Sequence, residues 1–305
     1  MFKRFAQKIT LGYYQTKFNT LGAISPVKAA NAAFTLFCTP YHGKPKRKAP
    51  GIFNKAVKQQ VIFEGLTMRG FQWKPAKSTG KRFLICHGFD SSCYKFAPFV
   101  APLLEKGFEV VAFDAAGHGV SDGETINALQ YSRFILQLEE QYGPFDVLMA
   151  HSLGALALSI AIEQMANQQE KKLVLIAPAT ETSSALNNFF HMIPVSFRVR
   201  KAFEQKIVDL GGKPIQWYSV TRAVQNIQCK ILWLHDKADP ICSFEDTKIA
   251  RQLKLPHIQF LITNNLGHSN IYKEPAIQKA IVDFSADDHF SIKKLEALQQ
   301  TYEWI

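Results

Sequence analysis

Short apolar runs alternate with amphipathic segments over most of this chain. The runs are rich in Val, Ile, Leu and Phe, and they lie at 81–86, 108–113, 147–150, 172–177, 230–235 and 258–262. Continuous apolar runs of this length are typical of strands buried on both faces of a parallel sheet. Helix-forming segments follow or separate them at 94–105, 125–142, 153–167, 244–253 and 272–286. Strands that alternate with helices predict an α/β fold, with a mostly parallel sheet covered on both faces.

A different pattern precedes the first buried run. Between residues 57 and 74 apolar side chains alternate with polar ones, and Glu64-Gly65 interrupts the alternation. Alternation on both sides of a two-residue turn is typical of a β-hairpin. We therefore expect an antiparallel hairpin at the edge of the sheet.

Residues 1–56 are predicted to form a helical arm outside the α/β core. Phe2, Phe5 and Ile9 share one face of a helix over residues 1–20, and the opposite face is basic. Lysines interrupt any apolar stretch that could act as a secretory signal, so no signal peptide is expected. The arm continues with a shorter helix at 27–38 and a basic linker at 44–48.

The positive charge of the chain is concentrated near this arm. Residues 1–82 contain 16 Lys+Arg and a single acid, Glu64, whereas the remaining residues contain 20 Lys+Arg and 24 Asp+Glu. This distribution argues against a nucleic-acid groove across the α/β core. The arm either packs against the core as a structural element or makes peripheral contact with an anionic membrane, as basic amphipathic helices do. The sequence of the arm is compatible with both packing against the core and contact with a membrane.

The amino-acid composition indicates the kind of protein and its cellular compartment. The chain has 305 residues, of which 47% are hydrophobic and 20% charged, an ordinary globular balance. No apolar run approaches the ~18 residues of a membrane span. The five cysteines form no CxxC pair and leave one unmatched, which indicates a reducing compartment. We expect a cytoplasmic protein, with attachment to the membrane surface as the alternative.

The alternation of strands and helices breaks between residues 178 and 222. Aromatic and apolar residues crowd this stretch together with arginines and lysines. It is predicted to be a helical insertion at 179–222, which divides the core into 57–178 and 223–286 and leaves a tail at 287–305. The aromatic content favours a lid that lines an apolar pocket, and simple packing of two helices is the alternative. The expected pocket residues are Phe189, Phe190, Met192 and Trp217.

Ser152 lies between an apolar strand and a helix-forming segment, in the sequence Ala150-His151-Ser152-Leu153-Gly154. A serine at the apex of such a turn has a strained backbone, and its neighbours two places away must be small. Gly154 meets this requirement, and Ala150 exceeds glycine by one methyl group. The pattern predicts a nucleophile elbow, with Ser152 as the nucleophile. The alternative is an ordinary turn in which Ser152 caps the helix.

A serine nucleophile needs a base, and the base needs a carboxylate to orient it. His268 follows the last predicted core strand on a loop opened by Gly267, and it is the expected base. Asp239 follows the preceding strand and is the expected acid, with Asp236 as its competitor. Asp239 is preferred because Pro240 stiffens its turn and the loop is long enough to reach His268.

The end of the first core strand would complete the site. Gly88 allows the backbone to approach a substrate, so the N–H groups of Phe89 and Leu153 are expected to form an oxyanion hole. His87 and His151 are predicted to support these loops rather than to carry protons, and His118 to stabilise its own turn. No set of His, Cys, Asp and Glu has metal-ligand spacing, so we expect neither a metal nor another cofactor.

Together these motifs resemble the α/β-hydrolase family. The His-Gly loop at 87–88, the Asp-x-x-Gly-His-Gly-x-Ser loop at 114–121, the serine elbow, the later aspartate and the Gly-His loop at 267–268 occur in family order. The resemblance covers about residues 57–286, and it is greatest to the bacterial single-domain branch related to monoacylglycerol lipases and carboxylesterases. The chain departs from the family pattern at Ala150, at Asp236 and at Ala116, where an arginine is common.

The resemblance implies a serine hydrolase that cleaves a small-molecule carboxylic ester through an acyl-enzyme on Ser152. It also implies that the insertion at 179–222 is a cap over the nucleophile, and its aromatic residues then favour an apolar acyl group. Thioester, carbon–carbon and perhydrolysis chemistry remain alternatives, because the same three residues serve all of them. A non-catalytic member of the fold, which binds a ligand or a membrane, is the alternative from a different class.

Overall fold

The computed structural model describes residues 2–41, 48–290 and 303–304, with side chains for 10–41 and 48–290. The chain forms two compact units. The helical unit consists of Met1–Thr39 and Glu181–Ser219, and the α/β unit of Pro40–Thr180 and Val220–Ile305. The predicted basic linker, apart from Lys48, lies outside the described residues, as does most of the predicted tail at 287–305.

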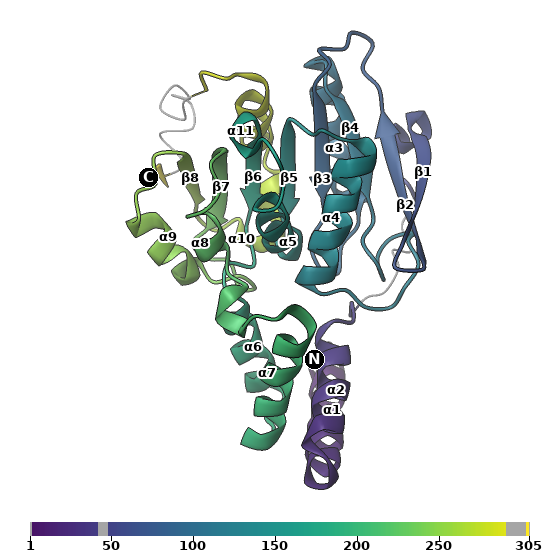
Figure 1. Cartoon of the computed structure of the whole chain (residues 1–305), viewed down its shortest axis with the longest axis vertical. Coiled ribbons are helices and arrows are strands. Elements are labelled where there is room, and N and C mark those ends of the chain that lie inside the picture. The colour runs from purple at the N-terminus through teal and green to yellow at the C-terminus, as the bar shows by residue number, and fades with distance from the viewer. Residues whose placement is uncertain (1, 42–47, 291–302, 305) are drawn as a thin grey trace. The chain divides into compact units, whose positions relative to one another are not determined.

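The described residues of the α/β unit form a nine-stranded sheet in the order β1-β2-β4-β3-β5-β6-β7-β8-β9. Figure 1 labels β1 to β8 of this sheet. The strands are β1 (Val57–Phe63), β2 (Leu66–Trp73), β3 (Arg82–Cys86), β4 (Glu109–Phe113), β5 (Val147–His151), β6 (Lys172–Ile176), β7 (Lys230–Asp236), β8 (Ile258–Thr263) and β9 (Glu303–Trp304). The six strands from β3 to β8 are mutually parallel. The hairpin of β1 and β2 joins them antiparallel at one edge, which confirms the predicted sheet.

The helices of this unit occur between the strands, as predicted. They are α3 (Ala97–Glu105), α4 (Ala128–Tyr142), α5 (Leu153–Ile162), α8 (Val220–Ala223), α9 (Lys248–Gln252), α10 (Gly267–Asn270) and α11 (Pro275–Ala286), and the 3₁₀ turns are η1 (Gly51–Lys55), η2 (Cys93–Phe96), η3 (Gln168–Glu170), η5 (Phe244–Thr247) and η6 (Ile271–Lys273). Helix α4 begins three residues later than expected because Asn127 caps it, accepting a hydrogen bond from the Gln130 N–H at 2.9 Å.

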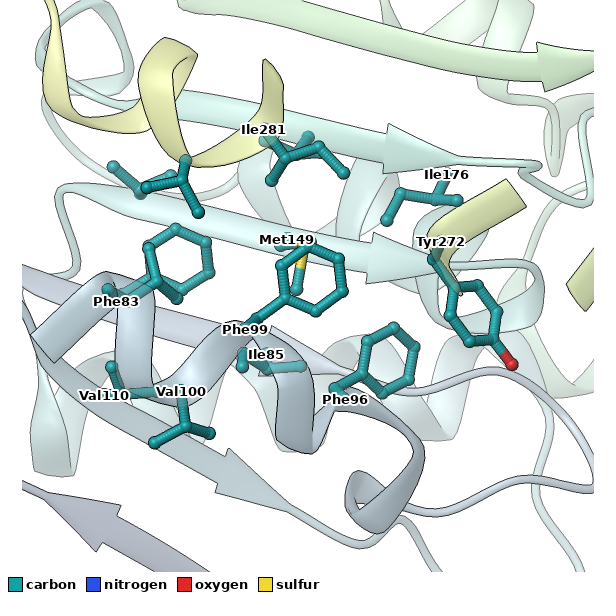
Figure 2. Close-up of a cluster of buried hydrophobic side chains, with 14 of the residues drawn as sticks. Phe83, Ile85, Phe96, Phe99, Val100, Val110, Met149, Ile176, Tyr272 and Ile281 are labelled. Atoms are coloured by element: carbon teal, nitrogen blue, oxygen red, sulfur yellow. The ribbon is translucent and has the colours of Figure 1, made fainter. Parts of the chain in front are cut away.

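The core lies on both faces of the sheet. On one face Phe83, Ile85, Val110, Met149 and Ile176 of the strands pack with apolar side chains of η2, α3, η6 and α11 (Figure 2). The contributing residues outside the strands include Phe96, Phe99, Val100, Tyr272 and Ile281. Phe113 points to the other face, where its ring lies 5.9 Å from that of Phe134 in α4. Helices therefore cover both faces, as the continuous apolar runs predict.

The helical unit contains α1 (Phe2–Ile24), α2 (Pro26–Phe37), α6 (Thr182–Met192), α7 (Phe197–Gly211) and the 3₁₀ turn η4 (Ile215–Trp217). Ser25 separates the first two helices and caps α2 by accepting a hydrogen bond from the Lys28 N–H. The buried side chains of α2 are alanines, which allow α7 to approach closely. Phe203 of α7 is the centre of an aromatic cluster, with ring centroids 5.4 Å from Phe34 and 5.2 Å from Phe190.

The division of the chain differs from the sequence-based one at residues 40–41 and 48–56. They were expected in the N-terminal arm, but they belong to the α/β unit. The reason is that Phe53 packs on the hairpin, 4.9 Å from the ring of Trp73, whose indole N–H donates to the Ile52 carbonyl at 3.0 Å. The rest of the arm shares a single compact unit with the inserted helices, which the sequence did not indicate.

The structure also describes the state of the cysteines and the length and apolar content of the helices. All five cysteines are free thiols. Within the described ranges, no helix combines the length and the apolar content needed to cross a bilayer.

Candidate active site

Ser152 occupies a sharp turn between β5 and α5. Its backbone has φ 53° and ψ −122°, a conformation that a residue with a side chain rarely adopts. The Ser152 N–H donates to the Ile176 carbonyl at 3.0 Å, and its carbonyl accepts from the Ala179 N–H at 3.1 Å. A Cβ atom on Gly154 would lie 2.3 Å from the His87 carbonyl oxygen. The turn therefore has the strain and the need for a small neighbour that the sequence predicts.

His268 and Asp239 are hydrogen-bonded to each other. The distance from His268 Nδ1 to Asp239 Oδ2 is 2.7 Å, and both side chains are buried. The other carboxylate oxygen of Asp239 accepts from the N–H groups of Ile241 and Cys242 at 2.8 and 2.9 Å. Because Nδ1 must carry a proton to donate to a carboxylate, the Nε2 atom of a neutral His268 has a free lone pair. The hydrogen bond to Asp239 thereby fixes the orientation of the His268 ring.

Asp236, the competing acid, has a different role. Its Oδ2 accepts from the Thr263 hydroxyl at 2.6 Å and from the Leu266 N–H at 2.9 Å, and its Oδ1 accepts from the Ala238 N–H at 2.9 Å. Burial acts to raise the pKa of Asp236, but these hydrogen bonds outweigh it and leave the pKa below its usual value. Through these hydrogen bonds Asp236 connects the end of β7 to the end of β8. Asp239 is the carboxylate on His268, in agreement with the sequence-based preference.

The Ser152 hydroxyl faces a residue that the sequence did not single out. Its Oγ lies 4.0 Å from the Sγ of Cys242, and among the described side chains no hydrogen bond joins it to His268. Cys242 follows Asp239 by three residues in the same loop. This closeness to the predicted acid in the sequence could have identified it as a residue near the site. The two loops nevertheless meet, because His151 Nε2 donates to the His268 carbonyl at 3.0 Å.

The end of β3 lies against the same turn. A Cβ atom on Gly88 would lie 2.7 Å from His151 Nδ1 and 2.9 Å from the Ser152 Cβ, so only glycine fits there. Phe89 follows directly. Helix α5 begins at Leu153, and the first N–H groups of a helix have no acceptor within it. Phe89 and Leu153, whose N–H groups are predicted to form an oxyanion hole, thus directly follow Gly88 and Ser152, which lie against each other.

Two buried histidines support these loops. His87 Nε2 accepts from the Ala115 N–H and His118 Nε2 from the Asp90 N–H, each at 2.9 Å. Their Nδ1 atoms donate to the carbonyls of Gly88 and Ala116. Both rings are therefore neutral, and a second proton on Nε2 would break a hydrogen bond to the backbone. Burial is the main cause that lowers the pKa of each to about 4.

These two histidines predict a stability that falls in mild acid. Since their pKa values are lower in the folded than in the unfolded chain, the unfolded chain binds more protons between pH 6.5 and 4, and acid favours unfolding. From pH 7 to pH 5 each should cost about 2 kcal/mol of unfolding free energy, measurable by urea denaturation.

The matched control is His118→Gln, which retains a donor and an acceptor but does not titrate. It should be less stable than the wild type at pH 7 and show a smaller loss on acidification, by about 2 kcal/mol. Equal losses for the two proteins would contradict the assignment of His118 as a buried neutral group.

The residues predicted to line an acyl pocket all belong to the helical unit. Phe189 and Phe190 are buried in its aromatic cluster, with ring centroids 5.2 Å apart. Met192 is 45% exposed, and Trp217 stacks edge-on with Tyr218. Packing within the unit accounts for the two phenylalanines. Across the described residues, no group of three His, Cys, Asp or Glu side chains could hold a metal ion.

Comparison with known proteins shows which family and which solved structures the chain is similar to. The model of a family described as the alpha/beta hydrolase family matches residues 83–276, which include Ser152, Asp239 and His268. Among curated relatives, a putative esterase/lipase 3 of Mycoplasma pneumoniae is 27% identical over 137 residues, covering 44% of this chain and 47% of that protein. A lysophosphatidylserine lipase of Bos taurus is 24% identical over 199 residues, covering 60% of this chain and 49% of that protein. The chain thus spans about half the length of these relatives.

Solved structures share the fold. The esterase Pf2001 of Pyrococcus furiosus superposes with a TM-score of 0.57 at 16% identity, covering 80% of this chain and 95% of the esterase. The monoacylglycerol lipase of Paleococcus ferrophilus gives a TM-score of 0.51 at 20% identity, covering 71% of this chain and 98% of the lipase.

Proposed function

Since this chain belongs to the alpha/beta hydrolase family, we propose that it is a serine hydrolase that cleaves carboxylic esters with an apolar acyl chain. The observation that carries the proposal is the 2.7 Å hydrogen bond between Asp239 and His268, on loops that meet the strained turn of Ser152. The esterases and lipases among its relatives support the same class of reaction.

In the proposed mechanism Ser152 attacks the ester carbonyl and transfers its proton to Nε2 of His268. The hydroxyl must leave Cys242 and turn toward His268, a rotation about the Cα–Cβ bond. Such catalytic hydrogen bonds are often long before substrate binds. Asp239 keeps the imidazole in the required tautomer and stabilises its positive charge.

The tetrahedral intermediate carries a negative oxygen, which the N–H groups of Phe89 and Leu153 stabilise. Its collapse breaks the bond to the leaving alcohol, which receives the proton from His268. Water then attacks the acyl-enzyme and gives a proton to His268. The bond between the acyl carbon and Ser152 Oγ breaks, His268 returns the proton to Oγ, and the carboxylic acid leaves.

The acyl preference is part of the proposal. Phe189 and Phe190 serve the core of the helical unit and Met192 is 45% exposed, so Trp217 is left as the candidate for contact with an apolar chain. Each methylene that a pocket removes from water contributes about 0.8 kcal/mol, or roughly fourfold in kcat/KM.

A panel of p-nitrophenyl esters of increasing acyl length tests this function. We expect kcat/KM to rise by about two- to fourfold per methylene up to a maximum set by the pocket. A matched panel of thioesters tests the alternative function. A thioesterase would cleave each thioester with a higher kcat/KM than the ester of the same acyl length. If no ester or thioester is cleaved and a fluorophosphonate probe does not label the folded protein, the chain is a non-catalytic member of the family.

A further inference from the structure

Two helix turns meet at one end of the helical unit. The Asn19 side chain in α1 donates a hydrogen bond to the Pro194 carbonyl, between α6 and α7, at 3.0 Å. Nearby, a Cβ atom on Gly22 would lie 2.5 Å from Val199 Cγ2 in α7, so α1 and α7 are in close contact. The turn between α1 and α2 therefore lies beside the turn between α6 and α7. We call this surface the tip and define it as residues 24–28 and 192–201.

Large apolar side chains are exposed on the tip. Ile24 is 81% exposed, Val27 63%, Met192 45% and Phe197 78%. Single exposed apolar residues are common on folded proteins, but several from two adjacent turns are typical of an interaction site. Packing within the unit does not require them, because its aromatic cluster is formed by other residues, such as Phe203, which is fully buried.

The same surface is basic. The tip contains four Lys+Arg and no Asp or Glu. Three of the four, Lys28, Arg198 and Lys201, are exposed. The whole helical unit has ten Lys+Arg and three Asp+Glu, a net charge of +7, whereas the rest of the chain has 26 and 22. Positive charge thus accompanies the exposed apolar side chains.

We propose that the tip docks on the surface of an anionic lipid bilayer. Phe197, Ile24 and their apolar neighbours would enter the boundary between headgroups and acyl chains, and the flanking basic side chains would contact anionic headgroups. A second copy of this chain fits the tip less well, because two tips in contact would place like charges against one another.

This surface differs from the one that the sequence indicated. The amphipathic face at residues 2–9 lies among side chains that are not described, whereas Phe18, later in α1, is buried in the helical unit. Deletion of residues 1–20 would therefore remove part of the core of the unit as well as any membrane contact. Point substitutions at the tip are the cleaner test.

Co-sedimentation of the full chain with vesicles measures the proposed binding. We expect binding to phosphatidylcholine vesicles that contain about one-third phosphatidylserine, little binding to phosphatidylcholine alone, and weaker binding at ~0.5 M salt. The double variant Ile24→Ser/Phe197→Ser should weaken binding about tenfold or more, because both side chains leave water on docking. Arg198→Glu/Lys201→Glu should abolish the preference for phosphatidylserine.

Ile62→Ser and Ile249→Ser are the matched controls, since these isoleucines are 65% and 62% exposed on the α/β unit. They should bind like the wild type, as should Ser152→Ala, so a failure of the proposed function leaves this test unaffected. Equal binding by the Ile24→Ser/Phe197→Ser variant and the wild type, with unchanged circular dichroism, would overturn the proposal. A dimer that this variant dissociates, without vesicle binding by the wild type, would assign the tip to self-association instead.

Discussion

Replacement of Ser152 by alanine is expected to lower kcat for ester hydrolysis by about 10⁴- to 10⁶-fold and to abolish labelling by a fluorophosphonate. The oxygen that would form the acyl-enzyme is lost, whereas the Cβ atom and the backbone hydrogen bonds of the turn remain. The unfolding temperature should therefore change little. Steady-state kinetics, probe labelling and a thermal melt measure the three quantities.

Ser159→Ala is the matched control for this prediction. Ser159 is a fully buried serine of the same helix, and its hydroxyl donates only to the Ala155 carbonyl, at 2.8 Å. Its replacement should leave kcat within about twofold, because it removes one local hydrogen bond of modest energy. Equal loss of activity in both variants, or continued labelling of Ser152→Ala protein, would show that another residue is the nucleophile.

Asp239→Asn should lower kcat by about 10³- to 10⁴-fold with little change in stability. An asparagine can still accept the N–H groups of Ile241 and Cys242 through its oxygen, but its amide group then faces His268 as a donor. The imidazole must accept that hydrogen bond at Nδ1, which moves its proton to Nε2, where the base must be free.

Asp236→Asn should have the opposite profile. This variant removes a carboxylate that accepts hydrogen bonds from the Thr263 hydroxyl and the Leu266 N–H. The unfolding free energy should therefore fall by about 2–3 kcal/mol. The kcat of the folded fraction should fall less than about tenfold, because no hydrogen bond joins Asp236 to His268 among the described contacts. If Asp236→Asn were the inactive variant and Asp239→Asn the active one, the assignment of the acid would be reversed.

The sequence predicted the sheet well because its strands are buried on both faces. Runs such as 147–150 and 173–177 are continuously apolar, and in a chain with helices between them such runs are typical of buried parallel strands. The residues at the carboxyl ends of these strands then fall at one edge of the sheet, which brings Ser152, Asp239 and His268 to one region. The sequence could therefore predict that these three residues lie in the same region, because their positions follow from the order of the parallel strands.

Contacts between distant loops were not predictable in this way. The position of Cys242 beside Ser152 depends on how the loop after β7 folds, and the hydrogen bond from His151 to the His268 carbonyl depends on how two loops meet. Helical periodicity likewise shows which face of α2 is apolar but not which helix covers it. The pairing of α2 with α7 therefore appears only in the structure.

The composition of the helical unit has a consequence for synthesis. Its first two helices leave the ribosome about 140 residues before α6 and α7, which at ~5–20 residues per second is a delay of roughly 7 to 30 s. Throughout that interval Phe34 and Phe37 have no Phe203 to pack against. A nascent chain that stops before residue 181 therefore exposes the apolar face of these two helices, and the helical unit can fold only after α7 has been synthesised.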